Sequence, residues 1–182
     1  MKTTALAVVL AAVAAFPAHA LGVQGMPPQA EFGGQPLVLN GAATQKVLWA
    51  KLYTVGLYLE EPTRDAHEAV ASEQTKLLRL KVLRNLSKRQ VAAALRQGFA
   101  RGAGSAFSTL EPRLGQLLAK LRDVRKSEEL LLMYVPGRGT VMSDGKRVRV
   151  EIPGKDFADA LFSIWLGPNT DAPHIRRALL GR

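Results

Sequence analysis

Cysteine is absent from this 182-residue chain, which excludes both disulfide bonds and thiol chemistry. Histidine is almost as scarce, with three residues in all. Only His67 and His174 lie beyond the first twenty residues, and neither has a metal-ligating partner three or four residues further on. The sequence therefore predicts no metal site, and it contains no motif for a cofactor.

Patterns typical of catalysis are equally scarce. There is no nucleophile-elbow motif. The adjacent pairs Glu60-Glu61 and Glu128-Glu129 cannot form an acid–base dyad on a strand, because neighbouring side chains point to opposite faces. The glycine-rich segment 102–105 lacks the spacing of a phosphate-binding loop and predicts a structural turn.

The first twenty residues predict a secretory signal peptide that is cleaved after Ala20. Lys2 supplies a positive start, residues 6–16 form an apolar run, and Ala18-His19-Ala20 is a small-x-small cleavage site. The alternative is a membrane anchor, but the run is too short to cross a bilayer. We therefore expect the mature protein to be exported to the periplasm.

Positive charge exceeds negative charge. The chain has 25 Lys and Arg residues against 15 Asp and Glu residues, a formal net charge of +10. In a cytosolic protein this excess would favour nucleic acid. Because export is expected, we predict instead an anionic small molecule or an anionic membrane surface as partner, and no nucleic acid. A solvated basic surface without a partner is the alternative.

The stretch Lys46–Glu60 predicts the central strand of the fold, because both of its faces are apolar. One face would carry Val47, Trp49, Tyr53, Val55, Leu57 and Leu59, and the other Leu48, Ala50, Leu52, Thr54, Gly56 and Tyr58. Such a strand is covered on both sides, by protein or by a ligand. We predict a short strand over residues 36–39 before it, with a tight turn at Asn40-Gly41.

The order of the remaining elements predicts an α+β fold. A strand over residues 75–83 precedes two helices, of which the first opens with a capping box at Ser87 and Gln90. Further strands and a last helix follow. This segregation favours one antiparallel sheet with its helices on one face. We expect an irregular lead-in over residues 21–35 and one domain over residues 36–182.

Three segments resemble the chalcone isomerase-like family, in particular its bacterial exported branch. Residues 51–60, Lys-Leu-Tyr-Thr-Val-Gly-Leu-Tyr-Leu-Glu, are similar to the signature strand of the family. Residues 39–43 resemble the approach to that strand, and residues 157–167 resemble the last helix. The resemblance implies an open-faced β-sandwich, in which a large antiparallel sheet carries a helical layer on one side. It also implies a ligand cleft between the long strands and the helices.

Two functions occur in the family that the chain resembles. Plant members close chalcones to flavanones, whereas other members bind fatty acids without known turnover. The positions that carry catalysis in the plant enzymes correspond here to Gln45 (with Lys46 beside it), Tyr53, Ser87, Ala94 and Ile164. None of them holds the plant residue. Because catalysis in this family is mostly orientation and charge stabilisation, losing the cationic anchor predicts a large loss of rate.

Fatty-acid-binding members hold a carboxylate with an arginine and a tyrosine. On strict alternation Arg84 shares the apolar face of the third strand, where an arginine requires an anion: a ligand carboxylate or an internal Asp or Glu. Tyr53 and Tyr134 are candidate hydrogen-bond donors, with core packing as the alternative. The predicted ligand-binding residues are Tyr53, Arg84, Tyr134, Lys46 and Gln45.

The sequence therefore predicts an exported, non-catalytic protein that binds a small amphipathic anion, such as a fatty acid, without cofactor or metal. The first alternative is an isomerase or intramolecular lyase of the chalcone isomerase type with an altered active site. The second is an interaction module that recruits a partner through its basic surface and has no cleft.

Overall fold

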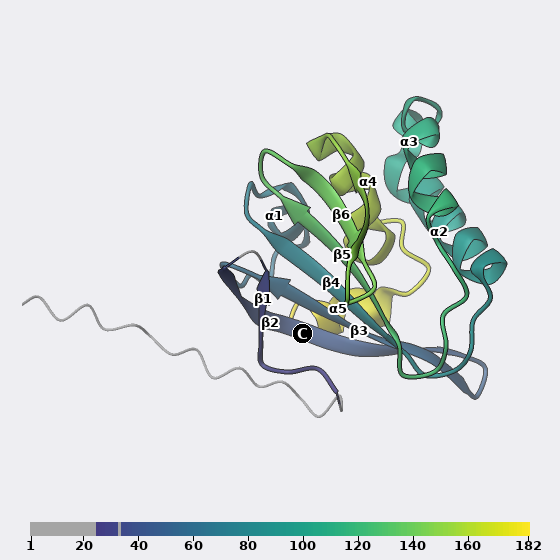
Figure 1. The fold of residues 1–182 in the computed structure, drawn as a ribbon. Coiled ribbons are helices and arrows are strands. Elements are labelled where there is room, and N and C mark those ends of the chain that lie inside the picture. Colours follow the sequence, from purple (N-terminus) through teal and green to yellow (C-terminus); the bar gives the residue numbers. More distant parts are fainter. Residues whose placement is uncertain (1–24, 33) are drawn as a thin grey trace, which may run out of the picture.

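A computed structural model describes residues 25–32 and 34–182 (Figure 1). The predicted signal peptide and the first residues of the predicted lead-in lie outside this part of the chain. Seven strands form one antiparallel sheet in which spatial order equals chain order. They are β1 (Gln29–Phe32), β2 (Gln35–Val47), β3 (Ala50–Leu59), β4 (Lys76–Val82), β5 (Glu129–Val135), β6 (Gly139–Ser143) and β7 (Val148–Ile152).

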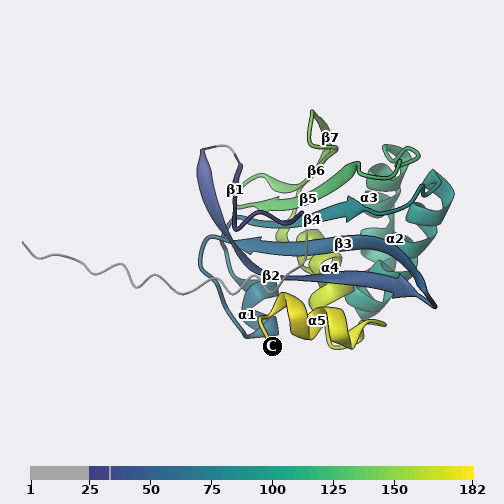
Figure 2. The same cartoon turned by 90° about the horizontal axis from the view of Figure 1, so that it is seen from below.

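The helices form a layer on one side of this sheet (Figure 2). They are α1 (Ala66–Ala71), α2 (Lys88–Ala103), α3 (Phe107–Ala119), α4 (Lys155–Leu166) and α5 (Pro173–Leu179), with a short 3-10 turn (Gly104–Ala106) between α2 and α3. The capping box at Ser87 and Gln90 is present at the start of α2. The predicted open-faced sandwich, with an antiparallel sheet and a helical layer, is confirmed.

The prediction of one long strand over Lys46–Glu60 is wrong in its first part. Val47 pairs with Ala50, and Leu48 and Trp49 form a two-residue hairpin turn between β2 and β3. The second part is β3, which lies between β2 and β4 inside the sheet. Turns are usually recognised by Gly, Pro, Asn and Asp, so a turn made of Leu and Trp carries no such signal.

The predicted turn at Asn40-Gly41 is also wrong, because β2 continues through it with a bulge between Leu39 and Gly41. Asn40 Nδ2 donates to the carbonyl oxygens of Leu179 (2.7 Å) and Thr63 (2.9 Å), and Asn40 Oδ1 accepts from Thr63 N (2.8 Å). The asparagine therefore fastens α5 and the loop after β3 to the sheet.

The lead-in predicted to be irregular contains an edge strand, since Gln29–Phe32 form β1 and pair with β2. This segment also helps to cover the sheet face that carries no helices. Tyr58 lies on that face, is fully buried and donates its hydroxyl to Pro27 O (2.9 Å). Protein therefore covers the C-terminal half of β3 on both sides.

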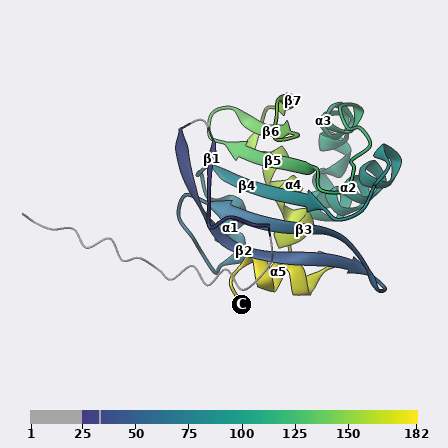
Figure 3. The same ribbon diagram turned by 60° about the horizontal axis from the view of Figure 1, so that its bottom comes forward.

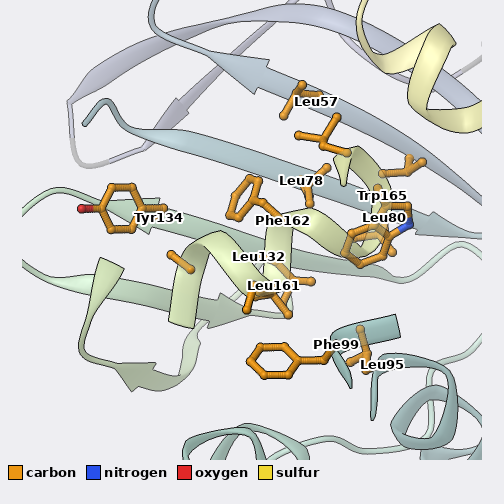
Figure 4. Close-up of a cluster of buried hydrophobic side chains, with 14 of the residues drawn as sticks. Leu57, Leu78, Leu80, Leu95, Phe99, Leu132, Tyr134, Leu161, Phe162 and Trp165 are labelled. Carbon is orange, nitrogen blue, oxygen red and sulfur yellow. The ribbon is translucent and has the colours of Figure 1, made fainter. Parts of the chain in front are cut away.

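The main core lies between the sheet and α4 (Figure 4). Leu57, Leu78 and Leu132 line the sheet side of this core, and Phe162 and Leu161 face them from α4. Helix α2 packs on the far side of α4, where it contributes Phe99 and Leu95 to the core. The smaller core on the opposite sheet face contains Met26, Leu37, Leu39, Tyr58, Leu77, Met133 and Val141.

Helices α2 and α3 form an excursion between the neighbouring strands β4 and β5. Its two ends are joined, because Leu86 and Val124 exchange backbone hydrogen bonds of 2.9 Å in both directions. The helices therefore leave the sheet and return to it at one point.

Two glycines bring α2 close to α4. A Cβ atom added at Gly98 would lie 2.6 Å from Ile164 Cγ2, and one added at Gly102 would lie 2.5 Å from the backbone oxygen of Ala160. Real Cβ atoms do not approach other atoms so closely, so the packing of these helices requires glycine at both positions.

Substitution Gly102→Ala should lower the free energy of unfolding. Overpacking against backbone costs about 1–3 kcal/mol, which exceeds the gain of about 1 kcal/mol in helix propensity. The matched control is Gly115→Ala in α3, where a Cβ would meet no atom within 4 Å. Urea denaturation should show the control stabilised by about 0.4–1 kcal/mol. Equal effects of the two substitutions would contradict the close helix contact.

A buried lysine closes the end of α1. Lys76 is 1% exposed, and its Nζ donates to the carbonyl oxygens of Ala69 (3.0 Å), Val70 (2.6 Å) and Ser72 (2.9 Å). Burial lowers the pKa of Lys76 to about 8, and the nearby charge of Lys155 acts in the same direction. The fold therefore favours the neutral form of this amine more than water does.

This lowered pKa predicts a pH-dependent contribution to stability. Between the folded pKa of about 8 and the ordinary value of 10.5, the unfolded chain holds a proton on Lys76 that the folded chain does not. The free energy of unfolding therefore rises with pH across this window. Urea denaturation of the native protein and of Lys76→Met over the same pH range should show their difference shifting in favour of the native protein. A constant difference would contradict the assignment.

Candidate functional site

An apolar cavity lies between the β2–β3 hairpin, the start of α2 and the end of α4. Its volume is about 530 Å³, inside the range of about 300–1,000 Å³ that is usual for small-molecule sites. Leu80, Leu95 and Trp165, which line it, lie together toward one end of the core (Figure 4). The cleft is thus between the long strands and the helices, where the family resemblance implies one.

Few polar side chains line the cavity. Among the described residues they are Trp49, Tyr53, Arg84, Asn85, Gln90 and Trp165. Asn85 Oδ1 accepts from Lys126 N (2.9 Å), and Gln90 Oε1 is taken up by the capping box. Arg84 is the one charged residue of the lining in the part of the chain that the structure describes.

Arg84 lies at the open rim of the cavity. Its side chain is exposed, and it forms no ion pair or hydrogen bond with residues 25–32 or 34–182. The neighbouring Leu83 N donates to Leu52 O (2.9 Å), which keeps this segment alongside the hairpin. The sequence predicted that Arg84 would pair either with an internal Asp or Glu or with a ligand carboxylate. Within the described chain, no internal carboxylate is paired with it. Its guanidinium is left to solvent or to a ligand.

A second polar group lies deeper, where β3 meets α4. Trp165 is 4% exposed, and its Nε1 donates to the hydroxyl of Tyr53 (3.1 Å). Burial raises the pKa of Tyr53, although the Trp165 bond partly offsets this, so the phenol stays protonated at neutral pH. The tryptophan uses the acceptor side of the phenol, so the hydroxyl hydrogen of Tyr53 remains able to donate.

Three of the positions aligned with plant catalytic residues meet at this cavity. Tyr53 of β3, Ala94 of α2 and Ile164 of α4 come from distant parts of the sequence, and all three line it. Among them only Tyr53 carries a polar group. The cavity therefore lies where the resemblance implies a cleft, and its walls at these positions are largely apolar.

The other two aligned positions lie outside the cavity lining. Gln45 shares the helix-facing side of the sheet because it pairs with Tyr53, but its Nε2 donates to Lys46 O (2.9 Å). Ser87 is the N-cap of α2. Lys46 is exposed near the end of the hairpin and is likewise absent from the lining.

Tyr134 lies away from the cavity. Its hydroxyl donates to Glu73 Oε2 (2.6 Å), and Lys76 Nζ and Lys155 Nζ each lie 5.6 Å from its ring centre. Tyr134 and Trp165 stand at opposite ends of the core (Figure 4). The structure thus brings Tyr53 and Arg84 together at one cavity and separates Tyr134 from them.

The hairpin turn is the part of the lining that the sequence prediction missed, because Leu48 and Trp49 were assigned to a strand. The sequence carries no signal for this turn, because Leu-Trp is not a turn-forming pair and the two lysines that the turn sets opposite each other, Lys46 and Lys51, repel.

Two further searches of the structure bear on the class of site. Within residues 25–32 and 34–182, no group of three or more His, Asp or Glu side chains could hold a metal ion. None of the helices in that part of the chain is both long enough and apolar enough to span a membrane.

Comparison with known proteins identifies the family. No curated protein sequence matches the chain at a significant level. A solved fatty-acid binding protein of Arabidopsis thaliana has a similar fold, with a TM-score of 0.66 at 14% identity, over 85% of this chain and 90% of that one. The model of the chalcone isomerase-like family matches residues 18–181. Since the match spans nearly the whole sequence, the chain belongs to the chalcone isomerase-like family.

Proposed function

We propose that this protein binds a small amphipathic anion of the fatty-acid type and does not turn it over. The observation that carries this proposal is the apolar cavity of about 530 Å³ with a single arginine, unpaired within the described chain, at its rim. The fold shared with the Arabidopsis fatty-acid binding protein supports the same class of ligand.

The placement of charge predicts how such a ligand lies. A carboxylate held beside Tyr53 and Trp165 would be buried without a cation, which is costly. At the rim, Arg84 can form charge-assisted hydrogen bonds with the carboxylate. The ligand therefore enters with its apolar tail toward Tyr53 and Trp165 and leaves its carboxylate at Arg84.

Export is part of the proposal and rests on residues 1–20, whose charged start, apolar run and small-x-small site are typical of a cleaved signal peptide. We propose that the mature protein acts in the periplasm, as a member of the exported bacterial branch. Cleavage removes Lys2 and leaves a net charge of +9, which supports an anionic membrane surface as a second partner.

Blocking the cavity should abolish ligand uptake. Ala93 and Ala94 are both exposed, but only Ala94 lines the cavity. Native mass spectrometry should show palmitate bound to the wild type and to Ala93→Trp, but not to Ala94→Trp, whose indole fills the apolar space. Because the two variants carry the same bulk on the same helix, a difference in folding would not account for the result.

Two outcomes would contradict this proposal. One is a wild-type protein that carries no lipid after purification and takes up no added fatty acid. The other is catalysis, since Tyr53 provides a hydroxyl on which an isomerase of the chalcone isomerase type with an altered site would depend. Ring closure of naringenin chalcone faster than the spontaneous reaction would favour that alternative.

Arg84→Gln should weaken palmitate binding about tenfold at low salt. A hydrogen bond to a charged group contributes about 1.5–3 kcal/mol, and the exposed position of Arg84 favours the lower end. The control is Arg89→Gln, which removes an exposed arginine that does not line the cavity. Isothermal titration calorimetry should show the loss only for Arg84→Gln, and equal losses would indicate a general charge effect.

A further inference from the structure

The end of the β2–β3 hairpin exposes large apolar side chains. Val47 is 52% exposed, Leu48 89% and Trp49 88%. Within the described residues, Val148 at 44% is the only other large apolar side chain that is exposed. Single apolar residues on a surface are ordinary, but three consecutive ones mark a contact site.

This hairpin tip, defined as residues 46–51, extends past its neighbours. The pairing of β3 with β4 begins only at Tyr53 and Val82, so the tip projects beyond the end of β4 (Figures 2 and 3). Val47, Leu48 and Trp49 also border the cavity. An apolar surface is therefore continuous from the exposed tip to the cavity.

Leu48 has an unusual backbone conformation. Its φ is +54°, in the left-handed region that favours glycine or asparagine and penalises a bulky side chain. Hairpin turns with positive φ at the first turn residue normally place glycine there. A leucine in this position stabilises neither the turn nor the core, and backbone strain of this kind is concentrated at functional sites.

The charges beside the tip are unfavourable in water. Lys46 and Lys51 are both exposed and directly opposite each other across the hairpin, an arrangement that destabilises a strand pair. No acidic residue offsets them within residues 32–59, and residues 74–110, which supply much of the opposite wall, contain none either. An anionic surface would relieve this repulsion.

We propose that the hairpin tip inserts into the interface of an anionic lipid bilayer. Val47, Leu48 and Trp49 enter the headgroup region, where tryptophan is favoured, while Lys46 and Lys51 contact lipid phosphates. The long lysine side chains can extend back to the surface from a shallow depth. Exposed apolar residues flanked only by positive charge suit a bilayer of this kind better than a protein partner of mixed charge.

The same geometry connects the bilayer to the proposed binding site. Because the inserted residues border the cavity, an amphipathic ligand can pass between the two without crossing open water. This second part of the inference rests on the proposed ligand-binding function, whereas insertion of the tip does not depend on it.

Tryptophan fluorescence can test the insertion directly. The chain has two tryptophans, Trp49 at the tip and the buried Trp165, so Trp165→Phe leaves Trp49 as the only reporter. Mixing with vesicles of equal parts phosphatidylglycerol and phosphatidylcholine should shift its emission to the blue and protect it from aqueous acrylamide. Vesicles of phosphatidylcholine alone should have a much weaker effect. An unchanged spectrum with both would overturn the proposal.

Variants of the tip give a second test by vesicle sedimentation of the full mature protein. Leu48→Asn should weaken binding roughly tenfold or more through lost apolar contact, with a melting temperature equal to or above that of the wild type, because asparagine tolerates positive φ. Lys51→Gln should weaken it roughly fivefold. The control is Val148→Asn, which removes the exposed apolar residue that lies away from the tip and should leave vesicle binding unchanged.

The outcomes separate this inference from the proposed function. Palmitate uptake without vesicle binding would overturn the inference and leave the ligand-binding proposal intact. Vesicle binding without palmitate uptake would overturn the ligand-binding proposal, together with the passage of ligand that rests on it, and leave insertion of the tip intact. Protection of Trp49 in the absence of lipid, together with a dimeric mass in sedimentation, would show that a second copy of the chain covers the tip and would also overturn the inference.

Discussion

The close contact between α2 and α4 fixes the arrangement on which the cavity depends. Gly98 and Gly102 bring the C-terminal half of α2 against Ile164 and Ala160. The N-terminal half of the same helix carries Ala94 and its neighbours over the cavity instead. Helix α2 therefore packs against α4 through its C-terminal half and covers the cavity with its N-terminal half. Its position is set by the two glycines, which allow the close contact.

The base of the cavity is held by a polar contact inside an otherwise apolar environment. The hydrogen bond from Trp165 to Tyr53 connects α4 to β3 and satisfies the indole N–H, which would otherwise be buried without a partner. It also orients the phenol. Because the one charged group of the described lining, Arg84, lies at the rim, the cavity has an apolar interior and a cationic entrance. That polarity matches an amphipathic anion.

The sequence predicted the sheet and the layer of helices, because period-two and helical apolar patterns report burial directly. The cleft was implied by the family resemblance and not by these patterns. The sequence did not predict the hairpin at Leu48 and Trp49, since an apolar turn is indistinguishable from a strand interior by composition. The reverse error occurred at Asn40-Gly41, a turn-forming pair that lies inside β2. There the amide of Asn40 fastens the C-terminal helix to a bulge. Strand alternation grouped Arg84 with Leu80 and Val82, and all three line the cavity. Strand alternation could not show that Tyr134 lies far from Tyr53. Alternation within one strand reveals which face of the sheet a side chain is on, whereas its position along the sheet depends on how the strands pair.

The paired backbone bonds between Leu86 and Val124 have a consequence for how this fold can diversify. They close the excursion that carries α2 and α3, so the covering helices are attached to the sheet through one narrow neck. Insertions or deletions at the turn between α2 and α3 therefore need not shift the register of β4 against β5. The length of the excursion can thus change while the hydrogen-bonded pairing of the sheet is kept.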